Sequence, residues 1–264
     1  MIAFNDEEAM NVLMGSSEIN KAIICEDQVF EITLSDFIDE AENVLLFHTS
    51  GWESVKEKVA EVSTDKKFRN KKVVGLIDRD YLDARDPNVF LGSSEYITTH
   101  LHDCEIDLIH SSAFDVFIKA KAQQKHKDSA EEIKSKIAER IRIIGCVRKY
   151  SHAYQKSWTI PAPGMKFNEK AWITTLKMEN KISAPEWESF EAWLLTEKND
   201  AKEVIHGHDF VSQLLEYLMR KTSRQEFSNQ CFETSENLAL SFDSKFKDEI
   251  PWVKKIWHSR IFCG

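Results

Sequence analysis

Several features that would assign the chain to a particular protein class are missing from it. No run of residues approaches the roughly 18 unbroken apolar positions of a membrane-spanning helix, and the N-terminus "MIAFNDEEAM" lacks the basic and then apolar order of a signal peptide. The five cysteines are far apart and form no C-x-x-C pair, so neither a disulfide framework nor a zinc ribbon is indicated. We expect a cytoplasmic chain with reduced thiols and no membrane partner.

The chain also lacks an excess of positive charge and the glycine-rich motifs of phosphate-binding loops. The formal net charge of −9 argues against sequence-independent binding of duplex nucleic acid, because such binding depends on Lys and Arg side chains that neutralise phosphates. Two local basic segments, 66–72 ("KKFRNKK") and 119–149, either contact nucleic acid or form ordinary solvated surface. The sequence contains neither G-x-x-x-x-G-K-[ST] nor G-x-G-x-x-G, so nucleotide hydrolysis would need another chain.

The first half of the chain alternates strand-like and helix-like segments. Hydrophobic residues make up 42% of the sequence, which is enough to bury a proper core. Their spacing predicts strands at 21–25, 43–49, 72–78 and 95–101, and helices at 29–41, 52–62 and 106–123. This order predicts an α/β fold, in which helices cover both faces of a mainly parallel sheet.

The second half shows helical periodicity and no convincing strand. Segment 129–147 places four isoleucines at spacings of four, four and three, which predicts an amphipathic helix: Ile133, Ile137, Ile141 and Ile144. After the helix-breaking "IPAPG" (160–164), further helices are expected at 186–197, 209–221 and in the tail. We therefore expect two domains, a sheet domain at 1–125 and a helical C-terminal domain at 126–264. The tryptophans of the helical half fit core positions or a partner-docking surface.

Four acidic residues follow predicted strands, and we expect all four to lie at the same edge of the sheet. Asp78 and Asp80 lie on either side of Arg79 in "GLIDRD" (75–80), Glu26 follows the first strand in "IICEDQVF", and Glu105 follows the fourth in "HLHDCEIDLI". The ends of parallel strands lie side by side, and residues two apart in an extended chain point the same way. Magnesium prefers oxygen ligands. The pattern predicts a Mg²⁺ site, with Mn²⁺ as a substitute.

Such a site suits phosphodiester chemistry, because one or two cations would polarise the phosphate and generate a water-derived nucleophile. Glu26 would act as general acid/base or bind a second ion, and Glu105 would complete the cage. The alternative is structural, since acids after strands are often helix caps. Asp27 is a candidate for such a cap.

Two histidine-containing segments remain ambiguous. In "HLHDC" (100–104), His100, His102, Asp103 and Cys104 are possible zinc ligands, but their crowding disfavours a tetrahedral shell, so packing or support of the magnesium site is expected. In "HGHD" (206–209), Asp209 is predicted to cap a helix, with Gly207 in the turn. Whether His208 and Asp209 join the active site is left open.

The segments "AIICEDQVF", "VVGLIDRDY" and "HDCEIDLI" together resemble the Toprim domain of topoisomerases, primases and OLD-family nucleases. The resemblance implies that Glu26 is the general acid/base, that Asp78 and Asp80 bind magnesium, and that Glu105 is the extra acid of an OLD-like two-metal site. Asp27 departs from the family pattern, which has glycine after the glutamate. A Toprim domain followed by a helical region containing "IHGHDFVSQLL" is similar to the Toprim effector subunits of PARIS anti-phage systems.

That resemblance implies a nuclease kept silent by an ABC/OLD-type ATPase subunit until a phage-encoded trigger releases it. The released chain would form a homodimer and cleave RNA, with host tRNA as the expected substrate. Two alternatives stay open: a catalytically inactive Toprim domain that serves as an interaction module for the ATPase, and a Toprim enzyme that acts on DNA.

Overall fold

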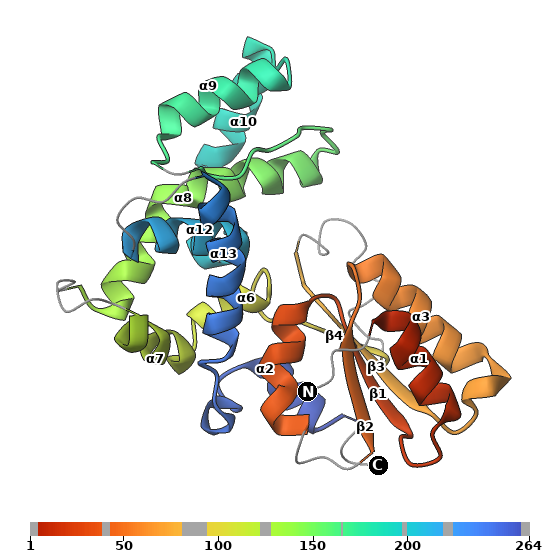
Figure 1. The fold of residues 1–264 in the computed structure, drawn as a ribbon. Helices are drawn as coiled ribbons and strands as arrows, with labels where there is room; N and C mark the ends of the chain where they lie inside the picture. The colour runs from red at the N-terminus through yellow and green to blue at the C-terminus, as the bar shows by residue number, and fades with distance from the viewer. Residues whose placement is uncertain are drawn as a thin grey trace.

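A computed structural model describes residues 5–38, 43–80, 94–121, 128–164, 166–196, 200–218 and 224–259. The protein has an α/β fold, in which a parallel sheet and its helices stand beside a larger helical region (Figure 1). The elements of the sheet half are α1 (Asp6–Gly15), β1 (Lys21–Cys25), α2 (Gln28–Ile38), β2 (Val44–His48), α3 (Trp52–Thr64), η1 (Lys66–Phe68), β3 (Lys72–Ile77) and β4 (Tyr96–Thr98).

The described sheet has four strands in the order β2-β1-β3-β4, and every neighbouring pair is parallel. The predicted strands are present, although β4 is shorter than the expected 95–101. The chain leaves the sheet early because the buried Asp107 carboxylate accepts hydrogen bonds from the amides of His100 (2.8 Å) and Leu101 (2.9 Å). These amides therefore bind a side chain instead of a strand.

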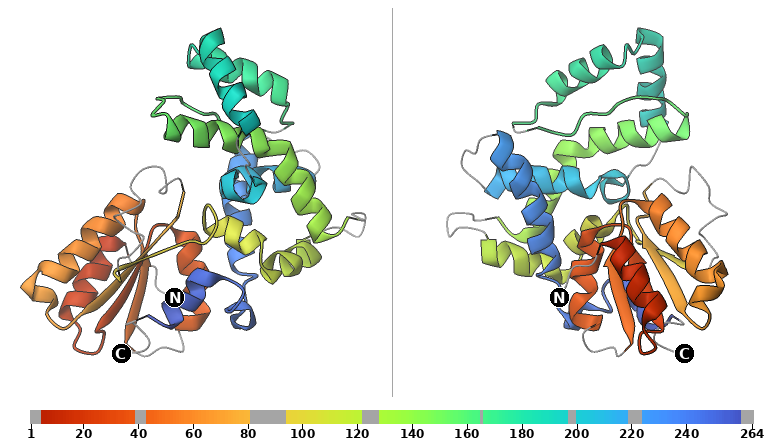
Figure 2. Two further views of the ribbon diagram at one scale, coloured as in Figure 1. Left: turned by 180° about the vertical axis from the view of Figure 1, so that it is seen from behind. Right: turned by 45° about the vertical axis from the view of Figure 1, so that its right-hand side comes forward.

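Helices cover both faces of the sheet, as expected. Along β1, Ile23 and Cys25 face one hydrophobic cluster while Ala22 and Ile24 face another, which is the period-two alternation of a strand buried on both sides. Helices α1 and α3 cover the second face, and α2 lies on the first (Figure 2).

The helical half wraps back onto the sheet half. Its elements are α6 (Cys104–Ile109), α7 (Ser112–Lys121), α8 (Ala130–Ala153), α9 (Glu169–Glu179), α10 (Ala184–Thr196), α11 (Ala201–Val204), α12 (Gly207–Leu218), α13 (Arg224–Ala239), η2 (Ser244–Phe246) and α14 (Pro251–Trp257). The helix predicted at 106–123 is thus two helices. All four isoleucines of α8 are buried, as predicted.

One hydrophobic cluster runs without a break from β1 through α8 to α14, and Trp252 of α14 meets Phe30 of α2 edge to face at 5.2 Å between ring centroids. The expected domain boundary at 125/126 lies outside the described residues. None of the helices that the structure describes combines the length and apolarity needed to cross a bilayer. Cys25, Cys104, Cys146 and Cys231 carry no disulfide.

Gly145 lets α8 pass very close to α11. A Cβ atom at this position would lie 2.1 Å from the carbonyl oxygen of Val204, a backbone atom that cannot rotate away. We predict that Gly145→Ala lowers the free energy of unfolding by about 1–3 kcal/mol, because overpacking forces the two helices apart. Urea unfolding followed by circular dichroism measures this loss. Gly15→Ala is the matched control, since a Cβ there meets nothing within 4 Å; equal effects of the two changes would contradict the prediction.

Candidate active site at the ends of the parallel strands

The candidate site lies where the strand order reverses. The chain runs from β1 outward to β2 and then crosses past β1 to β3, so the loops after β1 and β3 diverge at one edge of the sheet. Ligands of open α/β sheets bind in the crevice at such a reversal. Glu26 follows β1 and Asp78 follows β3, and they are direct neighbours, because the Asp78 amide donates a hydrogen bond to Glu26 Oε2 at 2.8 Å.

Glu26 connects three elements through its carboxylate. Besides the bond from Asp78, its Oε1 accepts a hydrogen bond from the amide of Trp52, the first residue of α3, at 3.1 Å. Burial raises the pKa of Glu26 to about 7, and the charges of Asp80 and Asp27 add to the rise, although the two amide bonds oppose it. A carboxyl group in this range can give up or take up a proton near neutral pH.

Asp78 and Asp80 line the same cavity, whereas Arg79 is not among its lining residues. Asp78 Oδ1 accepts a hydrogen bond from the amide of Cys104 at 2.9 Å, which ties the end of β3 to the start of α6. Burial first, and then the charges of neighbouring acids, raise the pKa of Asp78 well above its usual value. Asp80 has a left-handed backbone (φ 42°) and donates its amide to the carbonyl of His102 at 2.7 Å. Arg79 instead donates to the carbonyl of His100 at 2.9 Å.

Glu105 lies apart from the other three predicted acids. It belongs to the first turn of α6, and only 1% of the residue is exposed. Its Oε1 accepts a hydrogen bond from Ser235 Oγ at 3.3 Å and lies 3.5 Å from His208 Nδ1. Burial and the charges of Asp103 and Asp27 raise the pKa of Glu105 well above its usual value. The structure therefore places Glu105 next to His208 and not in the lining of the cavity that Asp78 lines.

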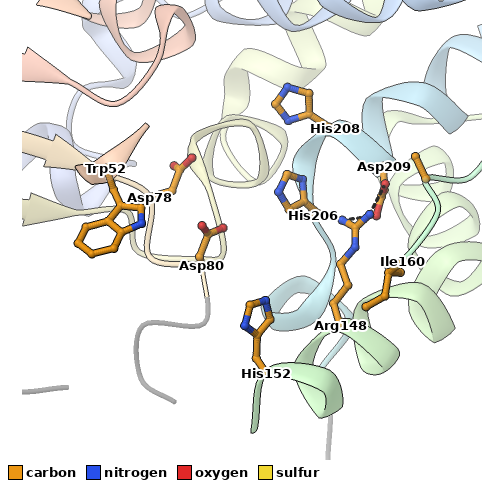
Figure 3. A pocket seen from close by; sticks show the side chains of 10 residues that line it. Trp52, Asp78, Asp80, Arg148, His152, Ile160, His206, His208 and Asp209 are labelled. Atoms are coloured by element: carbon orange, nitrogen blue, oxygen red, sulfur yellow. Dashed lines mark hydrogen bonds and ion pairs between the residues drawn. The ribbon is translucent and has the colours of Figure 1, made fainter. Parts of the chain in front are cut away.

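A cavity of about 540 Å³ opens in front of Asp78 and Asp80. Among the described residues, neither Glu26 nor Glu105 lines it. Figure 3 shows the two aspartates and Trp52 on the sheet side and histidines and an arginine on the helical side. The lining residues are Trp52, Asp78, Asp80, Arg148, His152, Ile160, Ala162, His206, His208 and Asp209. One wall thus carries two aspartates, and the other carries three histidines and the Arg148–Asp209 pair.

Arg148 of α8 and Asp209 of α12 form a two-pronged ion pair, with Nη1 at 2.8 Å from Oδ2 and Nη2 donating to Oδ1 at 3.2 Å. The prediction that Asp209 caps a helix is wrong. Helix α12 begins at Gly207, so Asp209 lies inside its first turn and is held by Arg148. Burial raises the pKa of Asp209 to about 6, although Arg148 opposes this. The predicted cap at Asp27 is present, since Asp27 Oδ1 accepts a hydrogen bond from the amide of Val29 at 2.9 Å.

Asp103 joins α6 to α12. Its Oδ1 caps α6 by accepting from the amide of Ile106 at 2.9 Å, and its Oδ2 accepts from the amide of Gly207 at 2.5 Å. Burial disfavours the anion, but the imidazoles of His102 and His206 and the Gly207 amide hold the pKa of Asp103 below its usual value. A Cβ at Gly207 would lie 2.5 Å from Asp103 Oδ1, which explains why glycine stands there.

Sequence reasoning did not single out His206, Arg148 or His152. His206 precedes α12, and its ring lies 5.2 Å, centroid to centroid, from the ring of the buried His102. His102 Nδ1 lies 3.4 Å from Asp80 Oδ1. The "HGHD" segment was a signal for His206, but only the fold brings it to the end of β3.

The acids at the strand ends fit a hard divalent cation. Glu26, Asp78 and Asp80 supply only oxygen donors, which Mg²⁺ and Mn²⁺ prefer. Burial, and then the charges of neighbouring acids, raise the pKa of both Glu26 and Asp78, so a cation held by these carboxylates would relieve their repulsion.

No protein-family model matches the sequence, and no curated protein is similar to it at a significant level. The function proposed below therefore rests on the geometry of the site.

Replacing Arg148 tests its ion pair with Asp209 on the helical wall of the cavity. We predict that Arg148→Met lowers the free energy of unfolding by about 3–5 kcal/mol, because it leaves Asp209 buried without its counter-ion. Arg142→Met on the same helix should have little effect, since Arg142 is 41% exposed and lies 3.8 Å from Glu139. Denaturant titration of both variants measures the difference. Similar stability of the two variants would show that the Arg148 pair contributes nothing.

Proton competition at Glu26 predicts that magnesium binding depends on pH. The pKa of Glu26 is raised to about 7, so below pH 7 the carboxyl group is protonated and must lose its proton before it can bind a cation. We expect Mg²⁺ affinity to be about tenfold weaker at pH 6 than at pH 8, and the Glu26→Gln variant to show a smaller change. Isothermal titration calorimetry on metal-free protein measures both. Equal affinity of the unaltered protein at the two pH values would refute the prediction.

Proposed function

We propose that the chain is a magnesium-dependent Toprim-type endonuclease that cleaves RNA, with tRNA as the first substrate to test. The observation that carries the proposal is the Glu26–Asp78 contact at the strand reversal: a carboxyl group that titrates near neutrality touches the residue that starts an Asp-x-Asp pair. Asp78 lines a cavity whose opposite wall carries Arg148 and three histidines.

The residues of the cavity suit a phosphodiester. Asp78 and Asp80, with Glu26 behind them, would hold the cation, which would neutralise phosphate charge and lower the pKa of an attacking water. Glu26 would transfer a proton at the scissile phosphate, because its pKa lies near 7. Arg148 and His152, both on α8, lie on the wall opposite the aspartates, where N–H groups of Arg148 beyond those on Asp209, together with the His152 ring, would donate hydrogen bonds to the substrate's phosphate groups (Figure 3).

RNA loops fit the cavity better than a regular duplex does. A volume of about 540 Å³ suits one or two nucleotides, and Trp52 in its lining, with Lys56 Nζ 5.8 Å from its ring centroid, would place an aromatic ring and a cation near an unstacked base. Sequence-specific RNA recognition commonly targets such splayed bases in loops and ends. The net charge of −9 agrees with local capture of an exposed loop and not with extended contact along a duplex.

Regulation by a second protein is part of the proposal. In the silent state the chain would be bound to an ABC/OLD-type ATPase subunit, and a phage-encoded trigger would release it to act as a homodimer in anti-phage defence. The absence of both nucleotide-binding glycine motifs supports the assignment of ATP hydrolysis to a different chain.

One observation favours the alternative of an inactive interaction module. Both oxygens of Glu26 and Oδ1 of Asp78 accept backbone hydrogen bonds, which is how acids act when they only fix loops. Cleavage of DNA by the same metal site is the third candidate, and the substrate panel below separates the three.

The direct test offers tRNA, single-stranded RNA and plasmid DNA to the purified chain with Mg²⁺ or with EDTA. We expect tRNA cleavage that requires the metal and falls by at least about 100-fold in Glu26→Gln and Asp78→Asn, because the acid/base and a metal ligand are lost. Glu57→Gln on the exposed face of α3 is the control and should keep full activity.

Cleavage in EDTA, or unchanged cleavage by Glu26→Gln, would refute the proposed chemistry. Cleavage of plasmid with tRNA left intact would establish the DNA enzyme. Tight binding of the ATPase with no cleavage of any substrate, even after the ATPase has been removed, would establish the interaction module.

A further inference from the structure

Three side chains from distant parts of the sequence converge beside the acidic strand ends. One ligand atom each of Asp80, His102 and His206 lies within 4.8 Å of the other two. Asp80 follows β3, His102 lies between β4 and α6, and His206 immediately precedes α12. The cluster therefore contains residues from both the sheet half and the helical half. Asp80 and His206 also line the cavity described above.

We propose that Asp80, His102 and His206 bind one transition-metal ion of the Zn²⁺ class, at a site that shares the Asp80 carboxylate with the oxygen-donor site of Glu26, Asp78 and Asp80. Two imidazoles and one carboxylate are a donor set that favours Zn²⁺, Fe²⁺ or Co²⁺ over Mg²⁺, because imidazole nitrogen binds these softer ions well and Mg²⁺ prefers oxygen.

The spacing of the ligand atoms agrees with such an ion. Two ligands at about 2.1 Å from a tetrahedral metal are about 3.4 Å apart, and His102 Nδ1 lies 3.4 Å from Asp80 Oδ1. The whole cluster is within 4.8 Å before any ion is added. Binding therefore requires only small rotations of side chains that the fold already brings together.

Asp103 places a buried negative charge beside both rings. Its Oδ2 lies 3.4 Å from His102 Nδ1 and 3.7 Å from His206 Nδ1, and 1% of the residue is exposed. These nitrogens also face the proposed ion, so the charge of the carboxylate favours a cation next to them. The amide of Gly207 donates to the same oxygen, which fixes the backbone next to His206.

A second, independent observation points to a ligand. His206 Nδ1 is buried and makes no hydrogen bond with any described residue. Buried polar atoms in native proteins nearly always have a partner, so such an atom beside an aspartate and a second imidazole indicates a missing one. Three protein ligands would also leave a coordination position open toward the cavity, as at catalytic rather than structural zinc sites.

Cobalt(II) is the probe, because its visible absorption becomes intense in four- or five-coordinate nitrogen and oxygen sites. Metal-free full-length protein is titrated with Co²⁺ and then with Zn²⁺ in the presence of excess Mg²⁺. We expect about one Co²⁺ per chain with intense absorption, displaced by Zn²⁺ and not by Mg²⁺. His206→Ala and Asp80→Asn should weaken Co²⁺ binding by at least about 100-fold.

Two comparisons make the result specific. His208→Ala removes a histidine two residues away that is exposed and outside the cluster, and it should bind Co²⁺ normally. Asp80→Asn should fold, because asparagine tolerates the left-handed backbone at this position. Circular dichroism checks the folding of each variant.

Equal Co²⁺ binding by His206→Ala and His208→Ala, or complete displacement of Co²⁺ by Mg²⁺, would overturn the proposal and leave His102–Asp80 as an ion pair only. The outcome does not depend on the nuclease proposal, since no nucleic acid is present. Glu26→Gln should keep the Co²⁺ spectrum whether or not the chain cleaves RNA.

Discussion

Backbone amides that bind buried carboxylates hold the centre of this protein together. The amides of Asp78 and Trp52 bind Glu26, the amide of Cys104 binds Asp78, and the amide of Gly207 binds Asp103. Each bond fixes the end of one element against the start of another, so β1, β3, α3, α6 and α12 meet at one point. These dipoles reduce the cost of burying negative charge without removing it, as the raised pKa values of Glu26 and Asp78 indicate. A bound cation would offset the remaining cost of burying these carboxylates.

Much of the sheet half follows from local pattern. The runs "KAIIC" and "NVLLFHT" are short, apolar and flanked by polar residues, and β1 and β2 lie where that pattern indicates. Once the strands are parallel and share an edge, residues that follow them must be near one another, which is why Glu26 and Asp78 could be paired from the sequence. Asp27 is a helix cap, and the sequence could predict it because a cap depends only on neighbouring residues.

The rest of the site depends on contacts between distant segments, which residue spacing does not encode. Asp209 has the sequence signature of a helix cap, but Arg148, 61 residues earlier, is its partner. His206 lies beside His102 and Asp80 because the segment before α12 folds back onto α6. This close approach requires glycine at position 207, since a Cβ there would clash with Asp103. The fourth strand was predicted too long because its β-branched residues continue past Thr98, whereas the tertiary hydrogen bonds of Asp107 end it.

Helix α14 closes the core of the sheet half from the far end of the described chain, since Trp252 packs against Phe30 of α2. During synthesis the ribosome makes the strands and their acids well before this helix. The apolar outer face of α2 therefore stays uncovered until more than 200 later residues have emerged, separating Gln28–Ile38 from Pro251–Trp257. A nascent chain therefore cannot complete this layer of the core until α14 has been made.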